Sequence, residues 1–262
     1  MTSQVMGAPA VRALRSPLES ARFGRSVDRL TVPADVSCPF SAVGDAILAS
    51  RADVIVCRYP AEHVDWFAKL ATLGRTAVLA DSLVYWRLPA GRGRRPEPAP
   101  GLRAAELTDP VVVDALVAGI FQAYGCHYLA NPLFDRDGAL AGYQEWARGS
   151  AAGGRCLALW DGHAGEEKGP VLALATLEDD PSRTEILLAG VVPQAQGHGL
   201  YAHLLRAVED RALARGAAEV VISTQGHNTR VQRAWSRYGF EPVRTVLTVH
   251  LVRSGLLPGR ER

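Results

Sequence analysis

The sequence predicts an α/β protein in which helices accompany a mixed sheet. Apolar runs with the alternation of strands repeatedly give way to longer stretches whose apolar residues recur with helical spacing. The 262 residues are 48% hydrophobic and 21% charged, a balance typical of globular proteins. We expect one or two domains that bury a core without disulfides or metals.

A break in composition divides the chain. The segment 90–100 reads AGRGRRPEPAP, and its Pro, Gly and Arg residues exclude both a helix and a central strand. We therefore expect a small N-terminal α/β domain over residues 1–89, a linker over 90–100 and a second domain over 101–262. The closely spaced arginines of the linker are typical of a solvated spacer.

The N-terminal domain is expected to have the order β-α-β-α-β. Its elements are predicted as a strand at 26–32, a helix at 41–50, a strand at 52–58, a helix at 61–73 and a strand at 76–88. The segment contains no Gly-rich phosphate loop and no nucleophile motif. We expect it to support the second domain or to shape its substrate site.

The second domain is expected to combine an antiparallel meander with helices. The predicted elements are a strand at 102–106, helices at 110–123 and 137–148, strands at 155–160, 171–178 and 184–192, a helix at 200–215, a strand at 218–224, a helix at 228–237 and a strand at 245–252. The meander is predicted for the three middle strands because polar or Pro/Gly segments separate them.

Charge and cysteine content favour a cytoplasmic protein. The formal net charge is +2, from 29 basic and 27 acidic residues, which gives no general attraction to nucleic acid or membranes. The four cysteines lie far apart without a C-x-x-C pair, so we interpret them as reduced thiols and expect no metal site. No apolar run has the length of a signal peptide or of a membrane span.

The most informative segment joins a strand to the start of a helix. It reads EILLAGVVPQAQGHGLY over residues 185–201, and the strand ends at Pro193 before the chain passes Gly197 and Gly199. The first N–H groups of a helix lack intrahelical partners and carry the positive end of its dipole, so they can bind a phosphate. Glycines let the phosphate approach the backbone. A simple tight turn would show the same pair of glycines.

The pattern Gln194-x-x-Gly197-x-Gly199 resembles the acyl-CoA pyrophosphate loop of the GNAT (GCN5-related N-acetyltransferase) superfamily. The predicted order of elements over about residues 102–252 is similar to the whole fold of that family. The resemblance therefore implies a GNAT acyl-CoA acyltransferase fold preceded by a small βαβαβ domain.

A second motif adds to the resemblance. The helix that begins at Asn228 and ends at Gly239-Phe240 is similar to the family's N-x-x-A-x-x-x-Y-x-x-x-G-F signature. The resemblance implies an N-acetyltransferase that moves an acetyl group from acetyl-CoA to a primary amine of a small molecule by direct attack.

The resemblance also implies a donor site. The backbone N–H groups from Gln196 to Leu200 would hold the CoA pyrophosphate, and the backbone of Val191 and Val192 would align the pantetheine. Asn228 would contact the pantetheine or phosphates, although an Asn at that place is also typical of an N-cap. The predicted donor residues are Val191, Val192, Gln194, Gln196, Gly197, His198, Gly199, Leu200 and Asn228. Gln196 stands where the family often has Arg, so one charge-assisted phosphate contact is missing.

Two glutamates are candidates for the base that deprotonates the amine. Some members of the family carry this glutamate at the beginning of the strand that leads to the loop, and Glu185 has that place. Its alternate neighbours Leu187, Ala189 and Val191 share its face. Glu178 on the adjoining strand is the second candidate, and a solvent-facing glutamate at a strand end is the alternative.

The general acid is less clear from the sequence. Trp235 occupies the position of the signature's tyrosine, and an indole N–H cannot serve as a proton donor near neutral pH. Tyr238, one helical turn along, and His227, just before the helix, are the candidate replacements. Packing of Tyr238 against the sheet and exposure of His227 in a turn are the alternatives. The thiolate can also take a proton from solvent or from the departing ammonium.

A third region suggests an acceptor site. The segments HYLANPLFD at 127–135 and GYQEW at 142–146, with FGR at 23–25, resemble a two-domain branch of the family that includes dTDP-fucosamine acetyltransferase. That enzyme acetylates an amino group on a nucleotide-linked sugar. The resemblance implies that His127, Tyr128 and Asn131 contact the acceptor, whereas a packed Asn-Pro loop is the alternative.

Two other functions remain open at this point. An acyltransferase with a larger donor, such as an aminoacyl-tRNA or an acyl-carrier protein, is suggested by the missing tyrosine and the basic linker. A non-catalytic CoA-binding protein is suggested by Trp235. The acceptor, the length of the acyl group and the choice between monomer and homodimer are left open.

Overall fold

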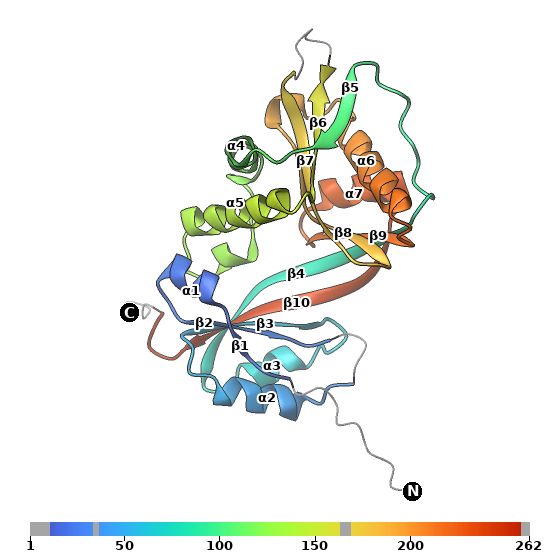
Figure 1. Cartoon of the computed structure of the whole chain (residues 1–262). Helices are drawn as coiled ribbons and strands as arrows, with labels where there is room; N and C mark the ends of the chain where they lie inside the picture. Colours follow the sequence, from blue (N-terminus) through green and yellow to red (C-terminus); the bar gives the residue numbers. More distant parts are fainter. Residues whose placement is uncertain (1–10, 34–36, 163–168, 258–262) are drawn as a thin grey trace, which may run out of the picture. The chain divides into compact units, whose positions relative to one another are not determined.

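The computed structural model describes residues 11–33, 37–162 and 169–257, which fall into two compact units. Unit 1 consists of the described residues up to 83, with 126–139 and those from 244 on, and unit 2 consists of 84–125 and the described residues of 140–243. Strands β4 (Arg75–Pro89) and β10 (Glu241–Arg253) contribute residues to both units (Figure 1).

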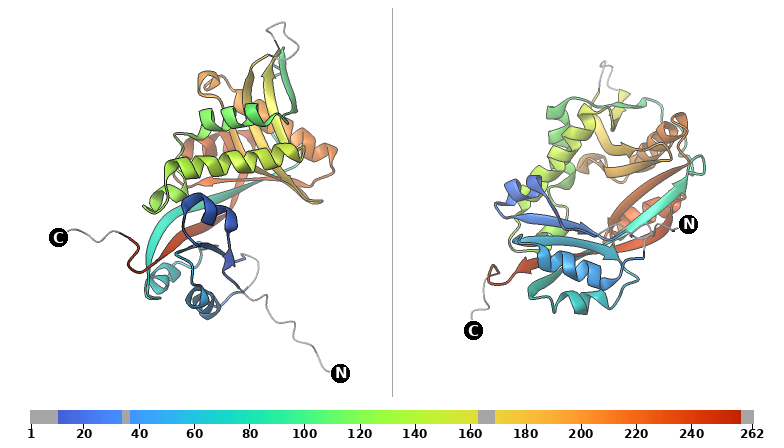
Figure 2. Two further views of the ribbon diagram at one scale, coloured as in Figure 1. Left: turned by 60° about the vertical axis from the view of Figure 1, so that its left-hand side comes forward. Right: turned by 60° about the horizontal axis from the view of Figure 1, so that its bottom comes forward.

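Unit 1 combines parallel and antiparallel strands. Strand β2 (Val27–Thr31) pairs antiparallel with β1 (Leu14–Arg15) and parallel with β3 (Val54–Pro60), and β3 pairs antiparallel with β10. The helices are α1 (Pro17–Phe23), α2 (Phe40–Ala49) and α3 (Trp66–Leu70). Helices α2 and α3 lie together on one side of these strands (Figure 2).

Unit 2 contains the meander. Strands β5 (Leu102–Glu106), β6 (Cys156–Asp161), β7 (Val171–Asp179) and β8 (Arg183–Val191) pair antiparallel in chain order, and β8 pairs parallel with β9 (Glu219–Gln225). The predicted meander and the predicted α/β class with a mixed sheet are therefore confirmed.

Four helices and two short 3-10 turns complete the described chain. The helices are α4 (Pro110–Phe121), α5 (Arg136–Ala152), α6 (Leu200–Ala214) and α7 (Thr229–Tyr238), and the turns are η1 (His127–Ala130) and η3 (Pro193–Ala195). In unit 2, α6 and α7 cover one face of the meander strands and α4 and α5 cover the other (Figure 1). Each face therefore has its own apolar core.

Most predicted elements are confirmed to within a few residues, and the differences have local causes. Helix α3 spans Trp66–Leu70 instead of 61–73, because β3 runs to Pro60 and turns follow it. Strand β1 and helix α1 were not predicted, since segments this short carry too few turns of periodicity to detect.

The last strand, β10, pairs with a strand that is distant from it in the sequence. Residues 246–252 of β10 pair with residues 54–60 of β3, although the sequence groups β10 with residues 101–262. Local patterns carry no information about such a pairing partner. The division into functional domains at residues 89 and 101 stays a prediction.

The predicted linker forms neither helix nor strand, but it is tied to α6. Glu209 is buried and accepts hydrogen bonds from the N–H groups of Gly91 at 2.9 Å and Gly93 at 2.8 Å. A Cβ atom at Gly93 would come within 2.3 Å of Glu209 and Tyr238. Close packing therefore explains a glycine in a segment whose composition indicated only a spacer.

Two further features follow from the described residues. All four cysteines lie in the described residues, and none of them forms a disulfide there. Within the described ranges, the helices are too short or too polar for a bilayer crossing.

Candidate functional site

The parallel pairing between strands β8 and β9 ends about halfway along each strand. Their parallel pairing runs from Arg183 opposite Glu219 to Ile186 opposite Ile222, but β8 continues to Val191 and β9 to Gln225. The backbone edges beyond these pairs are no longer joined to each other. The carboxyl ends of the two strands therefore frame an opening in the pairing, which we call the gap.

A β-bulge in β8 lies at the point where its pairing with β9 ends. Thr176 pairs with Leu188 and Leu177 pairs with Ile186, so Leu187 is an extra residue in β8. A bulge bends its strand and reverses the side-chain alternation. Ile186 and Val191 accordingly both pack in the core beneath α6.

The bulge changes the face that Glu185 occupies. Glu185 precedes Ile186, so it points to the opposite face, on the side of α4 and α5. The expectation that it shares a face with Val191 is wrong, because that expectation assumed an uninterrupted strand. The Glu185 side chain is 21% exposed and its carboxylate lies 3.5 Å from the Arg183 guanidinium.

A turn of glycines leads from β8 into α6. Gly197 has φ of +89° and Gly199, the N-cap residue of α6, has φ of +77°. Side chains with a Cβ rarely adopt such angles, which explains both glycines. Apart from the two adjacent residues, no heavy atom of the described chain would lie within 4 Å of a Cβ at either position. The start of α6 is therefore open, with its first N–H groups lacking intrahelical acceptors.

An arginine reaches this turn from α7. The Arg230 guanidinium donates to Gln196 Oε1 at 3.2 Å, and Gln196 Nε2 donates to the Val191 carbonyl at 3.1 Å. A positive charge thus lies beside the glycine turn, although Gln196 itself carries none. An anion at the start of α6 would meet both the helix dipole and this guanidinium.

The backbone of the predicted pantetheine segment already has partners. The Val192 N–H donates to the Leu172 carbonyl at 2.9 Å, and the Val191 carbonyl accepts from Gln196. A ligand that hydrogen-bonds to these two groups has to share or replace these bonds. Their predicted role in aligning pantetheine stays a prediction.

A cluster of polar side chains lies at the end of β9. The Tyr124 hydroxyl donates to Gln225 Oε1 and lies 3.1 Å from Thr224 Oγ1. Asn228 donates to the same Thr224 oxygen at 3.0 Å and makes no side-chain hydrogen bond as an N-cap. The structure thus links Asn228 to the strand end at the gap.

The aromatic residues of α7 have different partners. The Trp235 indole N–H donates to the Tyr201 hydroxyl at 2.9 Å, whereas the Tyr238 hydroxyl donates to Glu209 at 2.7 Å. Burial raises the pKa of both phenols above the ordinary value. Tyr238 thus lies with the linker and Trp235 with the first turn of α6, and a catalytic role for Tyr238 stays a prediction.

The predicted histidines near the donor turn are solvent-facing. His198 and His227 are exposed, and a Cβ at Gly125 would lie 3.7 Å from His227 Nε2. His227 therefore lies beside the segment that carries Tyr124. Its role as an acid or base stays a prediction.

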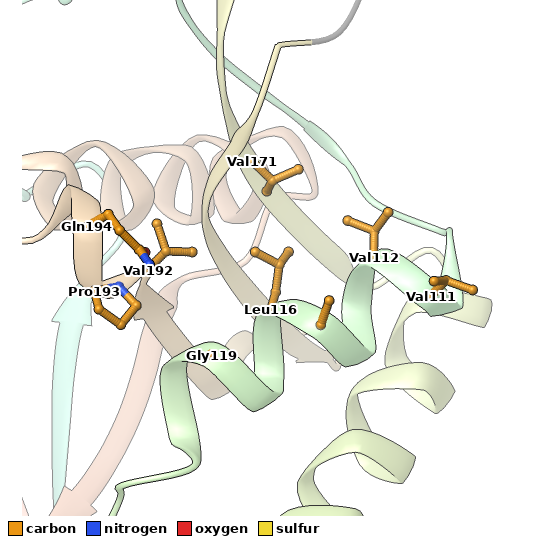
Figure 3. Close-up of a pocket in the computed structure, with 9 residues that line it drawn as sticks. Val111, Val112, Leu116, Gly119, Val171, Val192, Pro193 and Gln194 are labelled. Atoms are coloured by element: carbon orange, nitrogen blue, oxygen red, sulfur yellow. The ribbon is translucent and has the colours of Figure 1, made fainter.

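An apolar groove runs between α4 and the end of β8 (Figure 3). Its volume is about 500 Å³. Its walls are Val111, Val112, Ala115, Leu116 and Gly119 of α4, Val171 of β7, and Val192, Pro193 and Gln194 after β8. The groove therefore adjoins the predicted donor residues Val192 and Gln194.

The predicted acceptor residues lie in unit 1 and are buried. His127 Nδ1 lies 3.0 Å from His250 Nε2, and Asn131 Nδ2 lies 3.3 Å from His250 Nδ1. Burial lowers the pKa of both histidines, that of His250 to about 4, so both are neutral at pH 7. The structure thus brings His127 and Asn131 together, and their contact with an acceptor stays a prediction.

The third predicted acceptor residue joins a buried ion pair. Glu19 lies 2.6 Å from the Arg29 guanidinium and accepts a hydrogen bond from the Tyr128 hydroxyl. Burial alone would raise the pKa of Glu19, but the bonds and charge of Arg29 together with Tyr128 lower it to about 2. The carboxylate therefore remains charged inside unit 1.

The structure brings five further polar residues to the glycine turn, the first turn of α6 and the end of β9 that the sequence did not single out. These are Tyr124, Tyr201, Thr224, Gln225 and Arg230. Trp235 in the place of the signature's tyrosine was the available signal for a second phenol nearby. Arg230, two residues after Asn228, was the signal for a cation near the turn. Within residues 11–33, 37–162 and 169–257, no group of His, Cys, Asp and Glu side chains is arranged to hold a metal ion.

Comparison with known proteins finds a family model that matches the segment with these features. Residues 120–240 match the family model described as Acetyltransferase (GNAT) family. This range includes the glycine turn, the gap and the described residues of α6 and α7 up to Phe240. The resemblance derived from the sequence is therefore confirmed over this range.

Two curated proteins are similar in sequence. Mycothiol acetyltransferase from Corynebacterium aurimucosum is 32% identical over 89 residues, which cover 32% of this chain and 29% of that protein. Spore coat polysaccharide biosynthesis protein SpsD from Bacillus subtilis is 25% identical over 209 residues, which cover 80% of this chain and 68% of that protein. The chain thus spans less than a third of the first relative.

A solved structure shares the fold. The tandem GNAT protein from the clavulanic acid biosynthesis pathway superposes with a TM-score of 0.55 at 14% identity, covering 89% of this chain and 76% of that one. This likeness confirms the predicted GNAT fold class.

The buried pair of Glu19 and Arg29 predicts acid sensitivity. The pKa of Glu19 is about 2 in the folded protein against 4.5 as its ordinary value. Its stabilising contribution is complete above pH 4.5 and is lost as the pH falls toward 2. Glu19→Gln should lower the free energy of unfolding by about 3 kcal/mol at pH 7 and by much less at pH 3.

Urea unfolding of both proteins between pH 7 and pH 3 measures this difference. Glu62→Gln, which changes an exposed glutamate of the same unit, is the control and should show no such pH dependence. A Glu19→Gln effect that stays constant over this range would contradict the assignment.

Proposed function

We propose that this chain, whose residues 120–240 match the acetyltransferase (GNAT) family model, transfers an acetyl group from acetyl-CoA to a primary amine of a small molecule. The observation that carries this proposal is the open N-terminus of α6 behind Gly197 and Gly199. Similarity to a polysaccharide biosynthesis protein supports an amino sugar or a related biosynthetic intermediate as the acceptor.

The donor is proposed to bind through its phosphates. The N–H groups of residues 196–200 and the Arg230 guanidinium supply positive potential at the glycine turn. The missing positive charge at Gln196 is thereby offset by a residue of α7. Because Arg230 is exposed, we expect this contact to weaken as salt is added.

The gap between β8 and β9 is the proposed place of the thioester. It begins at the bulge in β8 and leads toward the glycine turn, so a donor held at the turn can extend along it. Holding the thioester and the amine together supplies several kcal/mol of barrier reduction. The amine nitrogen then attacks the carbonyl carbon, the carbon–sulfur bond breaks, and CoA leaves.

Glu185 is the proposed base for the amine. It lies near the point where the pairing of β8 and β9 ends, one residue before Ile186. Its carboxylate lies 3.5 Å from the Arg183 guanidinium. A small-molecule amine as the partner, with His127, Tyr128 and Asn131 as its contacts, belongs to the same proposal.

Larger donors and a non-catalytic role are the competing functions. The basic linker suggested a nucleic-acid-linked donor, but Arg95 lies 4.0 Å from Asp210 of α6 in the structure. Part of that charge is thus directed toward the protein's own surface. The open glycine turn favours acetyl-CoA, since its pyrophosphate is small enough to reach the backbone.

Calorimetric titration with acetyl-CoA tests the donor site. We expect low-micromolar binding to the wild type and at least about 30-fold weaker binding to Gly197→Glu, which corresponds to about 2 kcal/mol. The added carboxylate repels the pyrophosphate and a left-handed φ strains any side chain there.

Gly216→Glu is the matched control at the other end of α6. Gly216 has φ of +74° and equally open surroundings, so the strain and the added charge are the same. This variant should bind acetyl-CoA like the wild type. Equal binding by Gly197→Glu would contradict the proposed turn, and a folded wild type without binding would favour a carrier protein or aminoacyl-tRNA as the donor.

The proposed base gives a kinetic prediction. Glu185→Gln should lower kcat by about 10²-fold, with little change in acetyl-CoA affinity, because a positioned base contributes about 10²–10⁴-fold. Steady-state rates across pH, together with the titration, separate the two effects. Glu178→Gln, which alters the cross-strand neighbour of Glu185, is measured beside it. An unchanged kcat of Glu185→Gln at every pH would remove this residue from the mechanism.

A further inference from the structure

The first turn of α6 contains Tyr201, whose hydroxyl oxygen accepts a hydrogen bond. The buried Trp235 indole N–H donates to the Tyr201 hydroxyl at 2.9 Å. An indole N–H only donates, so the phenol oxygen acts here as the acceptor. Among the described residues, the Tyr201 O–H group donates to no side chain or carbonyl. Its proton is therefore available to a ligand.

This phenol lies close to the gap. Tyr201 follows Gly199 by two residues, and in a helix the side chain leans toward the N-terminal end. Tyr201 is also close enough to Tyr124 for the two phenols to interact electrostatically. Tyr124 contacts Thr224 and Gln225 at the end of β9, beyond the last pair with β8. Tyr201 thus lies in the first turn of α6, just after the glycine turn, and within electrostatic range of the side-chain cluster at the end of β9.

The proposed reaction needs a proton donor at this place. Attack of an amine on a thioester expels a thiolate, which is a better leaving group when a proton reaches the sulfur. Trp235 has the wrong chemistry for this task. The Tyr238 proton is directed to Glu209, which also accepts from the N–H groups of Gly91 and Gly93. These contacts tie Tyr238 to the linker.

We propose that Tyr201 is the general acid of the transfer and that Trp235 is its positioning residue. This inference rests on the proposed function. As the carbon–sulfur bond breaks, its electron pair goes to sulfur, and the Tyr201 hydroxyl gives its proton to that sulfur. The phenolate then recovers a proton from solvent, while the proton lost by the amine goes to the base. The products are an amide and the CoA thiol.

The surroundings of the phenol suit this role. Burial raises the pKa of Tyr201, so the group holds its proton at neutral pH, while the hydrogen bond from Trp235 acts in the opposite direction. That hydrogen bond stabilises the phenolate formed after transfer. The positive end of α6 stabilises the same negative charge. The pair therefore combines a phenol that is protonated before the reaction with contacts that favour the anion during it.

Tyr201→Phe removes the hydroxyl and keeps the ring. We expect kcat with acetyl-CoA to fall by about 10²-fold, while the calorimetric affinity for acetyl-CoA stays within about twofold because the phosphate contacts come from the glycine turn. Tyr59→Phe is the matched control. Tyr59 is a buried phenol in the core of unit 1 whose hydroxyl has no partner among the described residues, and its loss should leave kcat unchanged.

A second variant reports the proton itself. Replacing Tyr201 by 3,5-difluorotyrosine retains the shape and makes the phenol more acidic. Because only the protonated phenol acts, the alkaline limb of the pH profile of kcat should move to lower pH. A purely structural role of Tyr201 would leave this limb in place, and the measurement remains informative if Tyr201→Phe folds poorly.

The outcomes separate the inference from the proposed function. A wild type that transfers acetyl groups, with kcat of Tyr201→Phe within twofold of it, would overturn the inference alone. A loss confined to Tyr238→Phe would do the same and assign the acid to that residue. A folded wild type that transfers no acetyl group to any amine of a broad panel would overturn the proposed function and the inference together.

Discussion

The proposed donor site depends on one structural constraint, which is that the parallel pairing of β8 and β9 ends after Ile186 and Ile222. Two parallel strands that stayed paired to their ends would satisfy each other's backbone and leave no opening. The bulge at Leu187 lies directly after the last pair, and a bulge bends its strand and leaves one residue unpaired. The glycine turn, the polar end of β9 and the first turns of α6 and α7 all lie beyond this point.

The same bulge determines which side chains of β8 pack in the core beneath α6 and which lie on the side of α4 and α5. Ile186 and Val191 both pack beneath α6, which an uninterrupted strand does not allow. Glu185 is thereby directed to the side of α4 and α5. A single inserted residue thus separates the side chains that support the donor turn from the carboxylate proposed to receive the amine's proton.

Much of this arrangement could be predicted because its signals are local. Alternation, helical spacing and glycine at positive φ are properties of neighbouring residues, so the meander, α6 and its N-terminal turn followed from the sequence. The bulge at Leu187 could not be predicted, because it depends on how β8 pairs with β7. The bond between Trp235 and Tyr201 joins residues of two helices, and β10 pairs with β3 across most of the chain. No local pattern records such contacts.

A crystal structure with acetyl-CoA bound tests the central claim most directly, since it shows where the phosphates and the thioester lie. The account predicts phosphate oxygens within hydrogen-bond distance of the N–H groups of residues 196–200, and the thioester between β8 and β9 within reach of Tyr201. Phosphates bound at another surface, with the start of α6 empty and β8 and β9 uncontacted, would contradict it.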